Sequence, residues 1–170
     1  MKPTTFIFMG VCGCGKSLLG EMFARSQGGV FEDADHYHPA ANVAKMSAGI
    51  PLTDEDRAPW YAILRARILE MRQQTKCYVL ACSALKQSYR DLLRGEDPSD
   101  PIAFVYLQGT PELIKQRMAA RKGHFMPPTL VDSQFAILET PQDAIILDIE
   151  PAPDAILQDL IAQLNERTLL

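Results

Sequence analysis

The sequence has only four cysteines, one tryptophan and no long run of apolar residues. Cys12 and Cys14 form a C-x-C pair, but no second pair at zinc-ligand spacing follows along the chain. Structural disulfides belong mainly to secreted proteins, and no secretory leader is recognisable here. We therefore expect all four cysteines to be free thiols: Cys12, Cys14, Cys77 and Cys82.

An excess of positive charge is also missing. The chain has 17 lysines and arginines against 21 aspartates and glutamates, a net charge of −4. A nucleic-acid partner would require a basic field, so we expect none. No apolar run approaches the length that crosses a bilayer, and the apolar part of MKPTTFIFMG is too short for a signal peptide. We expect a cytoplasmic protein with no membrane partner.

What the chain does contain is an alternation of short apolar runs with helical patterns. Strands are predicted at residues 5–9, 30–33, 77–83, 102–109 and 144–149. Helices are predicted at residues 17–26, 39–49, 53–74, 84–95, 110–123 and 153–166. Buried strands separated by helices are typical of a parallel sheet covered on both faces. We therefore predict one α/β domain over residues 1–170, with a five-stranded parallel sheet in a three-layer fold.

The stretch GVCGCGKS after the first strand fits the phosphate-loop pattern G-x-x-x-x-G-K-[ST]. Glycines let the backbone curl so that several N–H groups face one anion, and the following helix adds its dipole. Lys16 is predicted to reach the β- and γ-phosphates of a nucleotide, and Ser17 to bind Mg²⁺. The predicted nucleotide-binding residues of this stretch are Gly10, Val11, Cys12, Gly13, Cys14, Gly15, Lys16, Ser17 and Leu18.

The motifs of other phosphate-loop proteins are absent. The chain contains neither the N-K-x-D nor the D-x-x-G string of a guanine-nucleotide switch. The third predicted strand ends in CSA, not in the Asp-Glu pair that is usual in a mechanical ATPase. The loop identifies the phosphate donor and not the acceptor, so a small-molecule or nucleotide kinase remains.

Ligands on a parallel sheet bind beyond the carboxyl ends of its strands, and DADHYH follows the second strand. Asp33 is predicted to hold Mg²⁺ through its water shell, and Asp35 to accept the proton of an attacking hydroxyl. Two histidines and two aspartates also suggest zinc, but a phosphate loop already explains a divalent ion that prefers oxygen ligands. His38 is interpreted as a hydrogen-bond partner of a polar substrate, and His36 as exposed.

Two basic clusters follow. Arg57 lies in LTDEDRAPW at the start of a predicted helix, while Lys86 and Arg90 are four residues apart and are predicted to share a helix face. A lysine and an arginine together can hold a carboxylate, the arginine through its bidentate fork. The alternative for each cluster is an ordinary solvated surface.

The stretch QRMAARKGHFMPP carries four basic residues and then paired prolines. A basic helix end that leads into a Gly/Pro segment is typical of a mobile lid over phosphates, which we predict at about 117–134. Arg117 and Arg121 are predicted to stabilise the transferring phosphoryl group. Lys122 and His124 belong to the same segment, for which a basic surface loop is the alternative.

Five strings together resemble the gluconokinase family, small ATP-dependent sugar-acid kinases of the thermoresistant bacterial type. They are MGVCGCGKS, DADHYHPAANVAKMSAGIPLTDEDRAPW, CSALKQSYRDLLR, RKGHFMP and SQFAILETP, and they lie in family order between Met9 and Pro141. The long second string separates this resemblance from shikimate kinase, which shares the phosphate loop and the D-x-D pair but lacks that block.

The resemblance implies an adenylate-kinase-like fold and a homodimer that uses ATP and Mg²⁺ to phosphorylate D-gluconate at its 6-hydroxyl. It implies catalytic roles for Lys16, Asp35 and Arg121. Metal binding falls to Ser17 and Asp33, and Arg117 and Arg121 join the nucleotide-binding residues. The substrate-binding residues it implies are Asp35, His38, Arg57, Lys86, Arg90 and His124.

The family usually has serines where this chain has Cys12 and Cys14. Because a thiol at a helix N-terminus can have a lowered pKa, we hypothesise that Cys14 makes the protein oxidation-sensitive. Inert replacement of serine is the alternative.

Other functions also stay open. The same scaffold suits a kinase for another sugar acid or a shikimate-like polyol, and a nucleotide-binding regulator without catalysis is a further alternative. The joint presence of Lys16, Ser17, Asp33 and Asp35 favours an enzyme.

Overall fold

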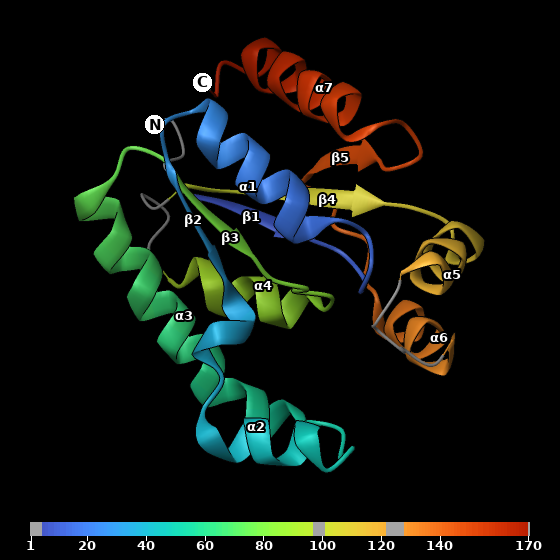
Figure 1. Ribbon diagram of the computed structural model, residues 1–170. Coiled ribbons are helices and arrows are strands. Elements are labelled where there is room, and N and C mark those ends of the chain that lie inside the picture. The colour runs from blue at the N-terminus through green and yellow to red at the C-terminus, as the bar shows by residue number, and fades with distance from the viewer. Residues whose placement is uncertain (1–4, 97–100, 122–127, 170) are drawn as a thin grey trace.

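The computed structural model describes residues 5–96, 101–121 and 128–169, arranged around one parallel sheet (Figure 1). The first elements in chain order are β1 (Thr5–Met9), α1 (Lys16–Ser26), β2 (Val30–Asp33), the 3₁₀ turn η1 (Ala34–Tyr37), α2 (Ala40–Ser47) and α3 (Asp54–Gln74). They are followed by β3 (Tyr78–Ala81), α4 (Gln87–Arg94), β4 (Ile102–Gln108), α5 (Pro111–Ala120), α6 (Pro128–Ile137), β5 (Ile145–Asp148) and α7 (Pro153–Glu166).

The strands run parallel to one another in the order β2-β3-β1-β4-β5. β1 lies at the centre, where Phe8 is in register with Ala81 of β3 on one side and Val105 of β4 on the other. Every residue of β1 is buried, which explains why TFIFM shows no polar alternation. Because parallel strands end at the same edge, the loops that follow β1, β2 and β3 meet there.

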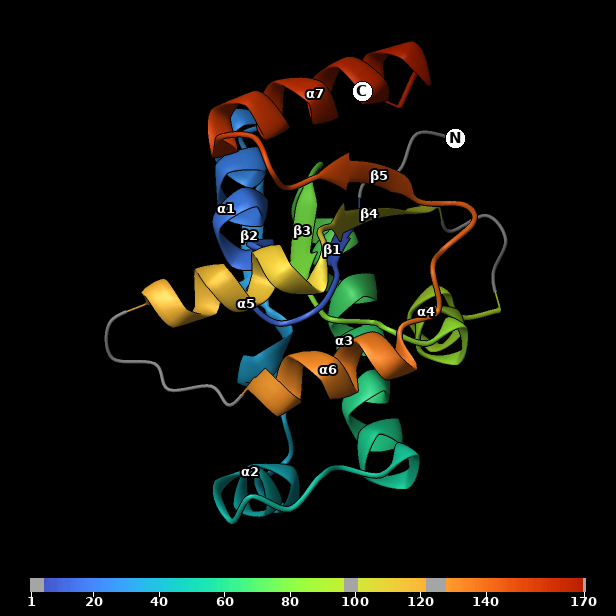
Figure 2. The same cartoon turned by 90° about the vertical axis from the view of Figure 1, so that its right-hand side faces the viewer.

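Helices cover both faces of this sheet, so the predicted three layers are confirmed (Figures 1 and 2). On one face, Phe6 and Phe8 of β1 share a buried cluster with residues of α1 and α7. On the other face, Ile7 and Met9 share a second cluster with residues of α3 and α4. The alternation of successive β1 side chains between the two clusters follows from the strand period of two.

The long helix α3 begins where the sequence predicts a cap. The Thr53 hydroxyl accepts a hydrogen bond from the Asp56 N–H, and the Asp56 carboxylate accepts one from the Thr53 N–H, a capping box. Trp60 and Leu64, one turn apart, are buried on the helix face that meets the sheet. The Trp60 indole N–H also donates to the Ala34 carbonyl at 2.9 Å, so α3 anchors η1 at the end of β2.

All predicted strands and helices are present, most with ends shifted by one to three residues, and two differences bear on the site. α4 begins at Gln87 and not at residue 84, because Ala84 has a positive φ of 44° and Lys86 is the extended N-cap. The second half of the predicted lid is helix α6, which begins at Pro128, a position where proline is tolerated because the first helical N–H has no partner.

The carboxyl edge of the sheet is bordered by α5 and α6, and α2 projects near the start of α3 (Figures 1 and 2). Within the described ranges, no helix is long and apolar enough to cross a membrane.

Candidate active site

The loop between β1 and α1 has a backbone that requires glycine. Gly13 has a φ of 77°, and Gly15, the N-cap of α1, has a φ of 97°. A Cβ atom on Gly13 would lie 2.5 Å from the Met118 Sδ of α5, so α5 packs directly on the loop. The first N–H groups of a helix have no intrahelical partner, which makes this loop and the start of α1 suited to an anion.

Lys16 curls back over the same loop. Its Nζ donates hydrogen bonds to the carbonyl oxygens of Gly10 and Val11 at 3.1 and 3.0 Å. Charged phosphate oxygens are stronger acceptors than neutral carbonyls, so the Lys16 ammonium is suited to an anion at this loop.

The structure brings the predicted metal-binding residues together. The Ser17 hydroxyl at the start of α1 donates to Asp33 Oδ2 at the end of β2, at 2.9 Å. The other carboxylate oxygen of Asp33 accepts a hydrogen bond from the Asp35 N–H at 3.0 Å. A hydroxyl and a carboxylate are oxygen donors that fit Mg²⁺. In the part of the chain that is described, no three His, Cys, Asp or Glu side chains gather in a way that could hold a metal by themselves.

The His38 ring lies against Trp60 of α3. It stacks on Trp60 with a centroid distance of 4.0 Å and an interplanar angle of 17°. Its Nδ1 lies 3.4 Å from the Asn42 side-chain nitrogen, and its Nε2 lies 3.8 Å from the exposed carboxylate of Asp35. Burial lowers the pKa of His38, and the Asp35 charge only partly opposes this effect. The ring is therefore neutral at pH 7 and able to donate or accept a hydrogen bond beside Asp35.

Two of the predicted carboxylate-binding cations converge on one carboxylate of the chain itself. Lys86 Nζ lies 3.2 Å from both carboxylate oxygens of Asp54, and Arg57 Nη1 lies 3.9 Å from Asp54 Oδ1. The Tyr89 hydroxyl also donates to Asp54. Hydrogen bonds from Tyr89 and Lys86 lower the pKa of Asp54, so this group is a carboxylate at neutral pH.

Arg90 does not share this cluster, which corrects the predicted common face with Lys86. Its side chain is buried, and its two Nη atoms donate to the carbonyls of Ala84, Leu85 and Glu139 and to the Gln87 side chain. The expected helical spacing fails because α4 begins after Lys86. Arg90 therefore braces the loop that carries Lys86, and its guanidinium does not face Asp54.

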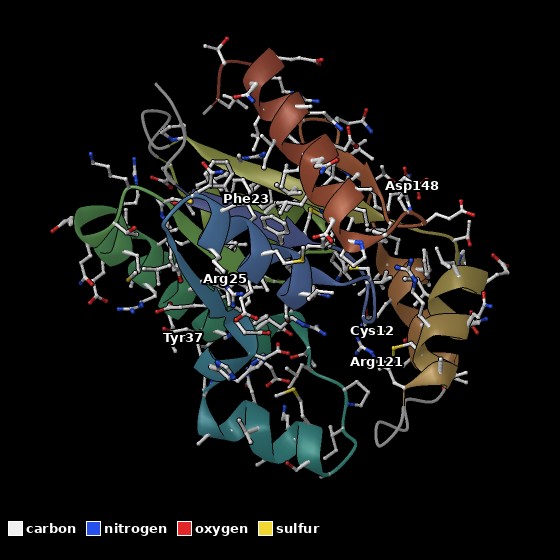
Figure 3. The ribbon with its side chains drawn as sticks, turned by 45° about the horizontal axis from the view of Figure 1, so that its top comes forward. Cys12, Phe23, Arg25, Tyr37, Arg121 and Asp148 are labelled. Carbon is white, nitrogen blue, oxygen red and sulfur yellow. The ribbon has the colours of Figure 1, made fainter. Side chains whose placement is uncertain are left out.

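The two predicted lid arginines, Arg117 of α5 and its C-cap Arg121, have different surroundings. Arg117 donates to the carbonyl of Ile149, the residue after β5. Arg121 is the exposed C-cap of α5 and lies beside Cys12 of the phosphate loop (Figure 3). The predicted residues Lys122 and His124 lie outside the described residues.

The pKa of the Cys14 thiol shifts in the direction opposite to the predicted one. Burial raises the pKa of Cys14, whose side chain is 1% exposed, and also raises that of Cys12. A Cβ on Gly10 would lie 2.8 Å from the Cys14 sulfur, which shows that this thiol points under the loop. The predicted lowering of the Cys14 pKa by the helix N-terminus is therefore wrong, because loss of hydration outweighs the nearby positive charges.

Three polar residues of this region belong to no motif that predicts a role for them. Gln134 of α6 accepts a hydrogen bond from the Cys12 N–H, and Glu139 after α6 accepts one from the Gln87 N–H at the start of α4. Asp54 is the third. Gln134 and Glu139 lie in SQFAILETP and Asp54 in LTDEDRAPW, but no spacing rule pairs them with partners so distant in sequence.

A cavity of about 610 Å³ lies at the carboxyl ends of β4 and β5. It is lined by the loop that enters α5, one side of α5 and the turn after β5. The lining residues are Gln108, Gly109, Thr110, Glu112, Leu113, Gln116, Asp148 and Glu150.

The relatives found by comparison with known proteins are kinases of small molecules. The shikimate kinase family model matches residues 12–144. A gluconokinase from Gluconobacter oxydans (strain 621H) is 44% identical over 164 residues, which cover 95% of this chain and 91% of that protein. The crystal structure of a gluconokinase from Sinorhizobium meliloti 1021 is 40% identical, with a TM-score of 0.84 over 96% of this chain and 93% of that one.

A shikimate kinase structure from Aquifex aeolicus is 14% identical, with a TM-score of 0.62 over 97% of this chain and 98% of that one, and so shares the fold alone. The sheet order, the phosphate loop and the Ser17–Asp33 pair define a P-loop kinase with a shikimate-kinase-like fold. Within this class, the chain belongs to the gluconokinase family.

Proposed function

We propose that the protein transfers the γ-phosphoryl group of ATP to the 6-hydroxyl of D-gluconate, giving ADP and 6-phospho-D-gluconate. One arrangement carries the proposal: the Ser17–Asp33 pair joins the phosphate loop to the D-x-D turn, with the exposed Asp35 next to it. The names of the relatives, gluconokinases at about 40% identity over nearly the whole chain, support the choice of acceptor.

On the donor side, the residues of the loop bind and orient phosphates. Lys16 exchanges the Gly10 and Val11 carbonyls for phosphate oxygens and so brings its positive charge to the β- and γ-positions. Arg121, exposed next to the loop, adds charge near the transferring group. Ser17 and Asp33 would hold Mg²⁺, which when bound neutralises charge on the phosphates.

On the acceptor side, we assign the proton of the attacking hydroxyl to Asp35, which is exposed and next in the turn to the metal-binding Asp33. Neutral His38 orients a substrate hydroxyl beside it. Arg57 and Lys86 bind the substrate carboxylate, since they already gather around a carboxylate in Asp54. Arg90 is a positioning residue, because its hydrogen bonds shape the loop that presents Lys86.

We assign the nucleotide base to the cavity at the ends of β4 and β5. Ligands of α/β sheets bind beyond the carboxyl ends of the strands, and this cavity adjoins α5, which packs on the phosphate loop. Its Glu112, Asp148 and Glu150 carboxylates disfavour phosphate and can accept hydrogen bonds from an exocyclic amino group.

The test is release of ADP by the purified protein with ATP and Mg²⁺, measured with gluconate, shikimate, glucose, AMP or no acceptor. We expect strong turnover with gluconate alone, and its loss in the Lys16→Ala variant. Shikimate is included because the shikimate kinase family model matches residues 12–144. Turnover with another acceptor would contradict the substrate, and no turnover with any acceptor would contradict the kinase reaction as proposed.

The homodimer and the His124 contact remain predictions. Sedimentation equilibrium tests the first, and the KM for gluconate of a His124→Ala variant tests the second.

A further inference from the structure

Asn42 of α2 is a buried polar residue that no motif of the sequence explains. Only 3% of its surface is exposed. Its side-chain nitrogen donates a hydrogen bond to the main-chain carbonyl of Asp56 in α3 at 3.0 Å. A carbonyl oxygen can only accept, so the amide nitrogen of Asn42, and not the amide oxygen, must face α3. The orientation of this side chain is therefore fixed by the main chain of another helix.

The same amide nitrogen also lies against the ring of His38. It is 3.4 Å from His38 Nδ1, and the His38 side chain is only 6% exposed. An amide NH₂ group has only hydrogens to offer, so a proton on Nδ1 would set two donors against each other. Asn42 therefore favours a ring in which Nδ1 carries a lone pair.

The opposite side of the His38 ring meets a carboxylate. Its Nε2 lies 3.8 Å from Asp35 Oδ1, and a negative oxygen attracts an N–H group and repels a lone pair. A neutral imidazole carries its one proton on either Nδ1 or Nε2. The amide on one side and the carboxylate on the other both place that proton on Nε2.

Trp60 holds the ring in the plane that joins these two contacts. The two rings stack at 4.0 Å, and the indole N–H of Trp60 is itself bonded to the Ala34 carbonyl at 2.9 Å. A half-turn of the His38 ring would put carbon atoms in place of both nitrogens and lose both contacts. Burial lowers the pKa of His38, the Asp35 charge opposes this and the Arg57 charge adds to it, so the ring is neutral at pH 7.

We propose that Asn42 is a positioning residue that keeps the proton of neutral His38 on Nε2, so that the ring presents an N–H donor beside the carboxylate of Asp35. The inference rests on the proposed function in one respect, that Asp35 and His38 face the phosphoryl acceptor. A donor and an acceptor 3.8 Å apart suit a hydroxyl group, whose oxygen accepts from Nε2–H while its own proton goes to the carboxylate. The pair therefore selects an alcohol over a carbonyl or ether oxygen, neither of which can donate.

The first test is the tautomer of His38, read by NMR from the nitrogen-15 chemical shifts of the ring in the full chain at pH 8 without substrate. The chain has three histidines, and His38→Phe shows which resonances belong to His38. We expect Nδ1 without a proton and Nε2 with one. Asn42→Asp has nearly the same shape but replaces the donor by an acceptor, so we expect Nδ1 to gain a proton in this variant.

Val43→Asp is the matched control. Val43 is the next residue of α2 and is 48% exposed, so this variant adds the same charge at a solvent-exposed position of the helix. We expect its Nδ1 to stay without a proton. A proton on Nδ1 in the wild type, an unprotonated Nδ1 in folded Asn42→Asp, or a proton on Nδ1 in Val43→Asp would overturn the proposal.

The second test is a double-mutant cycle on kcat/KM for gluconate. Asn42→Ala is expected to lower kcat/KM by about 10-fold in the wild-type background and by less than about 2-fold in the His38→Phe background, because Asn42 acts through the His38 ring. An equal fold loss in both backgrounds would overturn the proposal, since Asn42 would then only support α2. Thermal unfolding shows whether each variant is folded, and this cycle decides if Asn42→Asp does not fold.

The tautomer measurement needs no substrate, so the failure of this inference and the failure of the proposed function are distinguishable. Absence of turnover with gluconate contradicts the proposed function, and the tautomer still shows whether Asn42 sets the proton of His38. Turnover with gluconate together with a proton on Nδ1 of the wild type contradicts the role of Asn42 alone.

Discussion

The carboxylate of Glu32, in β2, joins three neighbouring elements. Arg67 of α3 donates to it from Nε at 3.1 Å and Nη2 at 2.6 Å, and the hydroxyls of Tyr37 and Tyr78 donate at 2.7 and 2.8 Å. Burial by itself raises the pKa of Glu32, but the hydrogen bonds from Arg67, Tyr37 and Tyr78 together outweigh it and lower the pKa from 4.5 to about 2. We predict that this network stabilises the fold in a pH-dependent way.

The perturbation is Glu32→Gln, which keeps the shape and removes the charge. A pKa lowered from 4.5 to about 2 corresponds to at most about 3.4 kcal/mol. The side chains of Glu32 and Arg67 are 18% and 25% exposed, and solvent screening reduces the expected loss to about 1–2 kcal/mol at pH 7. Because the pKa is lower in the folded state, this stability is complete above pH 4.5 and is lost as the pH falls towards 2.

The assay is urea-induced unfolding of wild type and Glu32→Gln at pH 7, 5 and 3. We expect the difference in the free energy of unfolding to shrink by more than half between pH 7 and pH 3. Glu70→Gln is the matched control, because Glu70 pairs with the same Arg67 at 2.8 Å but is 54% exposed. A difference that does not change with pH, or an equal loss in Glu70→Gln, would contradict a stabilising role for the Glu32 charge.

Three further predictions concern the site. Asp35→Asn is expected to lower kcat by about 100-fold or more while ATP still binds. Single-turnover kinetics and ATP titration check this, and turnover near that of the wild type would contradict Asp35 as the base. Lys86→Ala is expected to raise the KM for gluconate severalfold and to leave the KM for ATP unchanged, because Lys86 faces Asp54 and not the phosphate loop. Steady-state kinetics with each substrate varied in turn test this, and an equal rise in the KM for ATP would contradict it. Cys12 and Cys14 are expected to react with iodoacetamide at pH 7.5 more slowly than free cysteine, because burial raises the pKa of both thiols. Mass spectrometry measures the rate of labelling, and a rate above that of free cysteine would contradict the prediction.

The order of elements could be predicted from the sequence because each signal is local. TFIFM and VFED match β1 and β2 at both ends, since Gly10 follows the first run and Gly28 and Gly29 precede the second. The proximity of Ser17 and Asp33 could also be predicted, because Asp33 ends β2 and Ser17 follows the loop after β1, and the carboxyl ends of both strands meet at one edge. α6 escaped prediction because paired prolines and a basic stretch indicated a lid, and proline also suits the first turn of a helix.

The burial of side chains could not be read from spacing. Lys86 and Arg90 are four residues apart, but a left-handed Ala84 and a later helix start turn one towards Asp54 and the other into the loop. The pKa of Cys14 was predicted in the wrong direction for a related reason. A helix N-terminus is visible in the sequence, whereas the core that excludes water from the thiol is assembled from strands and helices far along the chain.

Three features can be recognised without coordinates: the class of fold, the phosphate loop and the acidic turn at the end of β2. These follow from the period of apolar residues and from glycines, which act over a few neighbouring residues. Two other features depend on the folded chain: Arg57 and Lys86 gather around Asp54, and Gln134 bonds to the Cys12 N–H, which is 122 residues away in sequence. Such contacts depend on how helices pack on the sheet, because packing brings together residues that no local pattern relates.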